Sequence, residues 1–369
     1  QNYAKTLDHL TLFHEANDKF QQAWDIHEKY LMDTVDLNGN RAVLLMNHAI
    51  TLDHLKRLHE ANDKFQQAWD IHQQFLMHKP NLHGTRTIIL VNHARTLDKL
   101  KRFKEAINKY QMAWDIHQEF LMHKKLHNNL AIMLTDYANT LSNLKFFSEA
   151  NQKYQKAWHI YETYLLDNQS LHRARAALLT HYAENLHNLK LFTAAKEKYQ
   201  QAWEIYQRFL MHREELHNAR AILLTLYAKT LDSMLLSDEA EEKHKLAWDI
   251  HEQYLMNRDD LNGTRAVLLM NYAKTLEKLE RFEEAETKYQ KAWQIHEQYL
   301  MHRDELTDTR ALILTNYGKL MYSIGEFVKA NELYSKAWGL YQGILKGRFD
   351  LSDSFSNLVT NWMCIWEYI

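Results

Sequence analysis

The sequence contains few of the residues that interrupt helices, and it lacks the cysteines on which disulfide-rich and zinc-binding proteins are built. Its 369 residues include 8 glycines and 1 proline, so we expect helix over almost the whole chain. Cys364 is the only cysteine, which excludes an intrachain disulfide and a cysteine-based zinc site. No apolar run approaches the roughly 18 residues of a membrane span, and we expect no membrane partner.

Charge and motifs exclude further classes of protein. Lys and Arg total 45 and Asp and Glu total 47, so the basic excess typical of nucleic-acid binders is missing and no such partner is expected. The sequence has no glycine-rich phosphate loop, no nucleophile elbow and no H-E-x-x-H helix. We therefore expect neither an enzyme nor a bound cofactor.

The ends and the glycosylation motifs say little about location. No signal-peptide pattern opens the chain, and Gln1 is not an initiator methionine, which indicates a processed form or a fragment. Sequons at Asn168 and Asn262 are weak indications of secretion. The sequence slightly favours a cytoplasmic location and leaves an extracellular one open.

What the sequence does contain is a repeat. One tryptophan recurs every 45 residues, except for one interval of 44: Trp24, Trp69, Trp114, Trp158, Trp203, Trp248, Trp293 and Trp338. Such self-similarity indicates a tandem array. We expect a single array over residues 1–369, with units at about 1–36, 37–81, 82–125, 126–170, 171–215, 216–260, 261–305 and 306–350 and a terminal helix at 351–369.

Each unit predicts two helices. Between Thr264 and Leu279 the apolar residues recur at helical spacing, and they do so again from Glu283 to about His302. Only a tight turn fits between the two helices, and a loop at about 304–308 leads to the next unit.

The second helix of every unit has a small–aromatic–small pattern. Alanines occur at two positions that bracket a ring, as in Ala285, Tyr289 and Ala292. This spacing lets two helices approach closely while the ring fills the gap between them. Together with Tyr272-Ala273-x-x-Leu276 in the first helix, the pattern resembles the tetratricopeptide repeat.

The resemblance covers the whole chain and implies an all-α superhelix, or solenoid, of eight helix-turn-helix units. The repeats are longer than the usual 34 residues, and Glu297 stands where a proline normally closes the second helix. Long repeats of this kind resemble those of kinesin light chains. HEAT and armadillo repeats share the period range, but this spacing fits them poorly.

In tetratricopeptide superhelices the first helices line a concave groove, which suggests a binding surface here. One row of side chains points away from the apolar stripe of the first helices: Asn47, Asn92, Arg95, Lys229, Asn271, Lys274, Lys278, Asn316 and Lys319. Side-chain amides can pair with the N–H and C=O groups of an extended peptide. We expect apolar pockets one turn earlier, at Val43, Ile88, Ile222 and Val267, and a site near one end of the array because Asp136, His181 and Leu226 break the row. A solvated face copied by duplication is the alternative.

Two further rows recur. Five histidines lie three residues after a tryptophan: His27, His72, His117, His251 and His296. Equivalent helices lie roughly 10 Å apart, too far for shared metal coordination, so we expect packed rings and no metal. Six first helices open with an arginine, for which we expect salt bridges to acidic loops such as Asp259-Asp260, or else a role with an anionic ligand: Arg41, Arg86, Arg175, Arg220, Arg265 and Arg310.

The last helix is apolar where a terminal cap is usually polar. Trp362, Trp366 and Ile369 form a candidate assembly interface, unless one face of the helix packs on the Trp338 helix. The leading function is a protein-interaction scaffold that takes an extended peptide or a partner helix in its groove. A self-assembling filament and the sensor arm of a larger signalling protein remain as alternatives. The expected partner is a protein or peptide, including a second copy.

Overall fold

The computed structural model describes residues 2–31, 34–121, 126–166, 168–344, 358–360 and 362. These residues form an all-α structure in two compact units, residues 1–174 and 175–369, with no strand in the described ranges. The first unit contains α1 (Asn2–His9), α2 (Phe13–Tyr30), α3 (Asn38–His54), α4 (Leu58–Ile71), α5 (His83–Lys99), α6 (Phe103–Ile116), α7 (His127–Asn143) and α8 (Phe147–Tyr164). Then follow α9 (His172–Asn188), α10 (Phe192–Ile205), α11 (His217–Ser233), α12 (Ser237–Ile250), α13 (Asn262–Lys278), α14 (Phe282–Ile295), α15 (Thr307–Ser323) and α16 (Phe327–Ile344).

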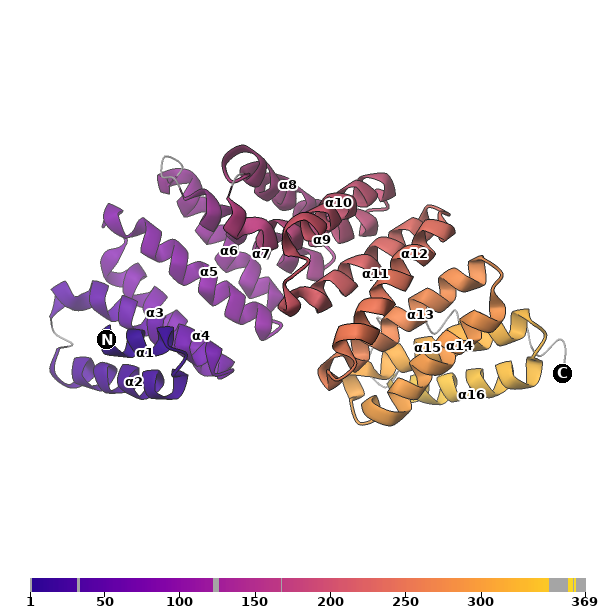
Figure 1. The fold of residues 1–369 in the computed structure, drawn as a ribbon. Helices are drawn as coiled ribbons and strands as arrows, with labels where there is room; N and C mark the ends of the chain where they lie inside the picture. The colour runs from indigo at the N-terminus through magenta and orange to yellow at the C-terminus, as the bar shows by residue number, and fades with distance from the viewer. Residues whose placement is uncertain are drawn as a thin grey trace. The chain divides into compact units, whose positions relative to one another are not determined.

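Along the chain an odd-numbered helix packs against the even-numbered helix that follows it, as α3 does with α4, α5 with α6 and α13 with α14, and Figure 1 shows such pairs in each unit. The predicted all-α repeat of two helices is therefore confirmed. That all pairs belong to one array over residues 1–369 stays a prediction.

A tight turn joins the helices of each pair. Between α13 and α14 the Arg281 amide donates to the Leu276 carbonyl at 2.9 Å, and Glu280 has a φ of 58°. This is the geometry that glycine usually supplies at the end of a helix. Here one turn, at Gly325, has glycine, and the equivalent residues with positive φ are Thr11, Lys56, Lys101, Lys145, Lys190, Leu235 and Glu280.

The small–aromatic–small pattern forms the core. Ala285, Tyr289 and Ala292 on α14 are completely buried. The ring of Tyr289 stacks on Tyr317 of the following first helix, with centroids 5.7 Å apart. Equivalent stacked pairs recur between other neighbouring repeats, such as Phe65 with His93. The alanines therefore let the helices approach, and the rings connect one repeat to the next.

The second helices end differently from the prediction. In five repeats the α-helix changes to a π-helical turn, and these turns are η2 (His72–Leu76), η4 (His117–Leu121), η6 (Tyr206–Leu210), η8 (His251–Leu255) and η10 (His296–Leu300). The histidines of the row open four of these turns, and His72 and His296 are fully buried, as predicted for packed rings. A short 3₁₀ turn, such as η11 (Asp304–Leu306), precedes the next first helix.

The arginine row corrects a prediction. Arg265 is buried and donates to the Leu255 carbonyl at 2.8 Å and to Asn262 Oδ1 at 2.6 Å. Arg86, Arg220 and Arg310 likewise donate to carbonyls at the end of the preceding helix. The salt bridges expected between these four arginines and the acidic loops were wrong, and Asp260, for example, pairs with the exposed Arg258. The physical reason is that the last carbonyls of a helix have no partner within that helix, and a guanidinium has enough donors to satisfy them.

The structure also describes the surroundings of the second sequon and of Trp362. Asn262 of the second sequon is buried and accepts from Arg265, so that side chain has no room for a glycan. Trp362 packs on α16: its Nε1 donates to Asn331 Oδ1 at 2.8 Å, and its ring lies 5.7 Å from that of Trp338. Trp366 and Ile369 lie outside the described residues.

Candidate peptide-binding surfaces

In the second unit, the predicted row brings three lysines onto neighbouring first helices. Lys229 lies on α11, Lys274 on α13 and Lys319 on α15, and α13 packs against both of the other helices. Burial lowers the pKa of Lys274. The Glu277 carboxylate opposes this shift, and Lys229 and Lys319 lower the pKa further. None of these three ammonium groups forms an ion pair with any residue that the structure describes. The row is therefore a line of cations without a close ion pair, and Glu277 is the acidic group that acts on Lys274 and Lys319.

The other predicted residues of this face divide into engaged and available side chains. Lys278 is engaged, because its Nζ lies 3.6 Å from Asp232 Oδ1 and donates to the Asp232 carbonyl at 3.0 Å. Asn316 lies with its Nδ2 3.7 Å from the Met270 sulfur, a weak contact, and Asn271 is half-buried beside the lysines. The neighbouring Glu277 has its pKa raised by burial.

In the first unit, the predicted residues face a different environment. The Arg95 guanidinium forms an ion pair with Asp136, with Nη2 and Oδ2 2.6 Å apart, and Arg95 also donates to Asn92 Oδ1 at 3.4 Å. Asp136 breaks the row in the sequence, yet in the structure it is the partner of Arg95. Asn47 lies half-buried on α3, outside the hollows described next. This face therefore carries no free cation at Arg95.

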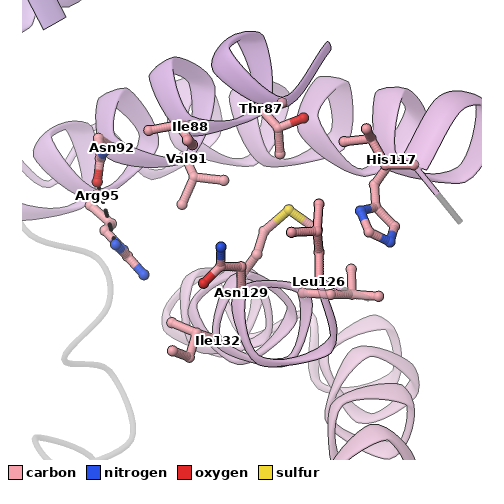
Figure 2. Close-up of a pocket in the computed structure, with 13 residues that line it drawn as sticks. Thr87, Ile88, Val91, Asn92, Arg95, His117, Leu126, Asn129 and Ile132 are labelled. Atoms are coloured by element: carbon pink, nitrogen blue, oxygen red, sulfur yellow. Dashed lines mark hydrogen bonds between the residues drawn. The ribbon is translucent and has the colours of Figure 1, made fainter. Parts of the chain in front are cut away.

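A hollow of about 330 Å³ lies between α5 and α7. Figure 2 shows Thr87, Ile88 and Val91 on one side and Asn129 and Ile132 on the other. The remaining lining residues are Gly84, Asn92, Arg95, His117, Leu121, Leu126, Leu130 and Met133. A second hollow, of about 220 Å³, reaches from Asn92 and Arg95 toward Ile50 and Asp53. The two polar side chains thus lie between two cavities, and the expected apolar pocket at Ile88 is present.

The larger hollow lies beside α7, a first helix that lacks the arginine found near the start of six other first helices. Six of the first helices begin with the capping arginine, but α7 has Leu130 at that position, four residues after Leu126. In the neighbouring repeat, Arg86 reaches the Leu76, Met77 and Lys79 carbonyls. The leucine is shorter and has no donor, and it borders the hollow instead of filling it. The 44-residue interval falls in the same place, between Trp114 and Trp158.

Sequence reasoning missed Leu130, Met133 and Asn129. The sequence does contain a signal for this hollow, because the missing arginine and the shortened interval between tryptophans occur in the same repeat. His117, which also borders the hollow, has its pKa lowered by burial and then by His127. Burial thus favours the neutral imidazole, and the Arg95 guanidinium in the lining is paired with Asp136.

Comparisons with known proteins establish the fold. No protein-family model matches the chain, and no curated protein sequence does. The crystal structure of the apo form of RapI is similar over 99% of this chain and 96% of that chain, at 13% identity and a TM-score of 0.60. A tetratricopeptide repeat protein from Parabacteroides merdae is similar over 88% of this chain and 99% of that chain, at 15% identity and a TM-score of 0.51.

Nearly identical TPR-like repeats assigned to a kinesin light chain of Podosopora anserina are similar over 61% of this chain and 99% of that chain, at 18% identity and a TM-score of 0.48. The predicted fold, an all-α solenoid of tetratricopeptide-like repeats, is confirmed. Within the described ranges, no helix is long and apolar enough to cross a membrane, and no three His, Cys, Asp or Glu side chains gather as metal ligands.

Proposed function

We propose that this protein is an interaction scaffold that holds an extended, acidic segment of a partner protein along the first helices of its second unit. The observation that carries the proposal is the row of Lys229, Lys274 and Lys319, three cations on adjacent helices without an ion-pair partner among the described residues. The tetratricopeptide-like fold supports a scaffold of protein interactions in general.

The row selects the chemistry of the ligand. Lys274 is half-buried, whereas Lys229 and Lys319 are exposed, and all three ammonium groups repel one another. A carboxylate placed between two of them relieves that repulsion. About six extended residues span three first helices that lie roughly 10 Å apart. An extended segment with a carboxylate at every second or third residue would match this row, and in this proposal the Asn271 and Asn316 amides bind its backbone.

The proposal is tested with a fluorescein-labelled peptide of alternating Glu and Ala, and fluorescence anisotropy measures its binding. We expect Lys274→Glu to weaken binding about tenfold or more, because it inserts an anion at the centre of the row. Lys245→Glu is the matched control, since this exposed lysine lies on a second helix, α12, and the change in net charge is the same. Added salt should weaken the wild-type interaction.

Two results would contradict the proposal. One is equal weakening by Lys274→Glu and Lys245→Glu, which would show only an effect of overall charge. The other is equal binding of an alternating Lys and Ala peptide.

The filament alternative has a separate test. It depends on Trp366 and Ile369, whereas Trp362 packs on its own chain. Light scattering over a hundredfold dilution measures the mass, and growth into long species that Trp366→Asp abolishes would favour self-assembly. The sensor-arm alternative has no residue in this chain that argues for it.

A further inference from the structure

The hollow between α5 and α7 is unlike the lysine row in both shape and charge. It is a concavity enclosed by Ile88, Val91, Leu126, Leu130 and Met133. Arg95, which lines the hollow, is neutralised by Asp136, with Nη2 and Oδ2 2.6 Å apart. An anionic ligand therefore gains nothing here, and an apolar one removes this lining from water.

We propose that this hollow is a pocket for one large apolar side chain of a bound extended segment, such as leucine, methionine or phenylalanine. The proposal deepens the proposed function, because it rests on first helices of this array holding an extended segment of a partner, and it adds an apolar subsite on the first helices of the first unit.

The size of the hollow argues for a side chain. Its volume of about 330 Å³ is at the lower end of the roughly 300–1,000 Å³ of small-molecule sites. One large apolar side chain fits within this volume, and the apolar lining matches such a side chain. Met133, which lines the hollow from α7, has a flexible and polarisable side chain that can adapt to branched or unbranched occupants.

The rim supplies the contacts that a peptide backbone needs. Asn92 on α5 uses its Oδ1 to accept from Arg95, which leaves its amide N–H groups as donors. Asn129 on α7 is exposed on the opposite side, as Figure 2 shows. A segment that crosses from α5 to α7 would place backbone groups between these two amides and one side chain in the hollow.

The chain itself provides the control that fills the pocket. Leu130 occupies the position of the capping arginine, so Leu130→Arg should extend a guanidinium toward the end of η4, as Arg86 does beneath η2. This variant closes the hollow and adds the missing helix cap, so it should remain folded.

The test uses two blocked tripeptides, acetyl-Ala-Leu-Ala-amide and acetyl-Ala-Glu-Ala-amide. The reporter is the ¹³C-labelled methyl group of Met133 in the NMR spectrum of the full chain, assigned with Met133→Leu. We expect the leucine peptide to shift this signal in a saturable way and the glutamate peptide to bind at least about tenfold more weakly. Leu130→Arg should abolish the shift.

A second pair of variants guards against a failure to fold. Ile88 is 45% exposed at the rim, so Ile88→Asp should be tolerated and should weaken the leucine peptide about tenfold. Ile222→Asp at the equivalent position of α11, in the second unit, should leave the Met133 signal unchanged.

The proposal is overturned if the leucine peptide leaves the Met133 methyl unmoved, or if it binds folded Leu130→Arg as well as the wild type. These failures are distinct from those of the lysine row. The acidic peptide can bind while the leucine peptide does not, which removes the pocket alone; the reverse result removes the acidic-segment proposal alone.

Discussion

Replacement of Arg265 by methionine should destabilise the second unit strongly although the residue lies in no binding surface. The side chain is buried, and its guanidinium donates to the Leu255 and Met256 carbonyls and to Asn262 Oδ1. Methionine retains an unbranched apolar stem of similar length, so the change removes the donors while leaving much of the packing in place.

The magnitude follows from the groups left behind. Each buried acceptor that loses its partner costs about 1–3 kcal/mol, and hydrogen bonds from a charged donor lie at the upper end. With two carbonyls and one side-chain oxygen affected, and with partial compensation by water, we expect a loss of about 3 kcal/mol. Arg265→Lys should recover only part of it, because one ammonium cannot reproduce the fork of the guanidinium.

Denaturant unfolding followed by circular dichroism measures the free-energy change, and hydrogen exchange locates it. Since stability in repeat arrays is a sum of unit and interface contributions, the faster exchange should concentrate in α12, η8 and the start of α13. The control is Arg258→Gln, which removes an exposed arginine from the same loop and should leave the midpoint unchanged. An Arg265→Met variant within about 0.5 kcal/mol of the wild type would refute the capping argument.

Three further changes test other parts of the fold. Burial lowers the pKa of His251 and of His296 from 6.5 to about 4, so the unfolded chain binds more protons between these values and stability should fall as the pH drops from about 6.5 to 4. His296→Tyr, which copies Tyr206 of another repeat, should reduce that fall in pH-dependent unfolding, and an unchanged slope would exclude this histidine. Leu235→Gly should raise stability by about 1 kcal/mol, because Leu235 has a φ of 62° and is 85% exposed, and a thermal melt that moves downward would contradict the strain argument. Ala285→Leu should cost about 1–3 kcal/mol by overpacking against the neighbouring helix, and Ala285→Gly separates this effect from loss of helix propensity.

The sequence determines the helix pairs and the core because both depend on local periodicity. Ala285, Tyr289 and Ala292 recur at fixed spacing, and this pattern is buried when two helices approach closely with the ring between them. The arginine row was recognised but misinterpreted. A nearby Asp is visible in the sequence, whereas backbone carbonyls at the end of the preceding helix are present in every sequence and give no signal.

The candidate sites were less predictable, because they depend on pairs of residues from different repeats. Arg95 was expected to be available, but Asp136, which lies 41 residues further along the chain, neutralises it. The hollow arises because Leu130 stands where six other first helices have arginine. This difference is recognised only when all units are aligned with one another and the role of the arginine is known.

The arginine caps also decide where this chain could be cut and spliced. Boundaries drawn from the repeat period, such as 260/261, separate Arg265 from the carbonyls of Leu255 and Met256 that it satisfies. A segment exchanged between such boundaries would depend on the incoming neighbour to restore its helix end, and a neighbour of the α7 type, with Leu130, would not do so. Exchanges made at the turn within a helix pair, near Glu280, would keep each second helix and its arginine on the same piece. The interchangeable module of this protein is thus offset by about one helix from the repeat that its tryptophans mark.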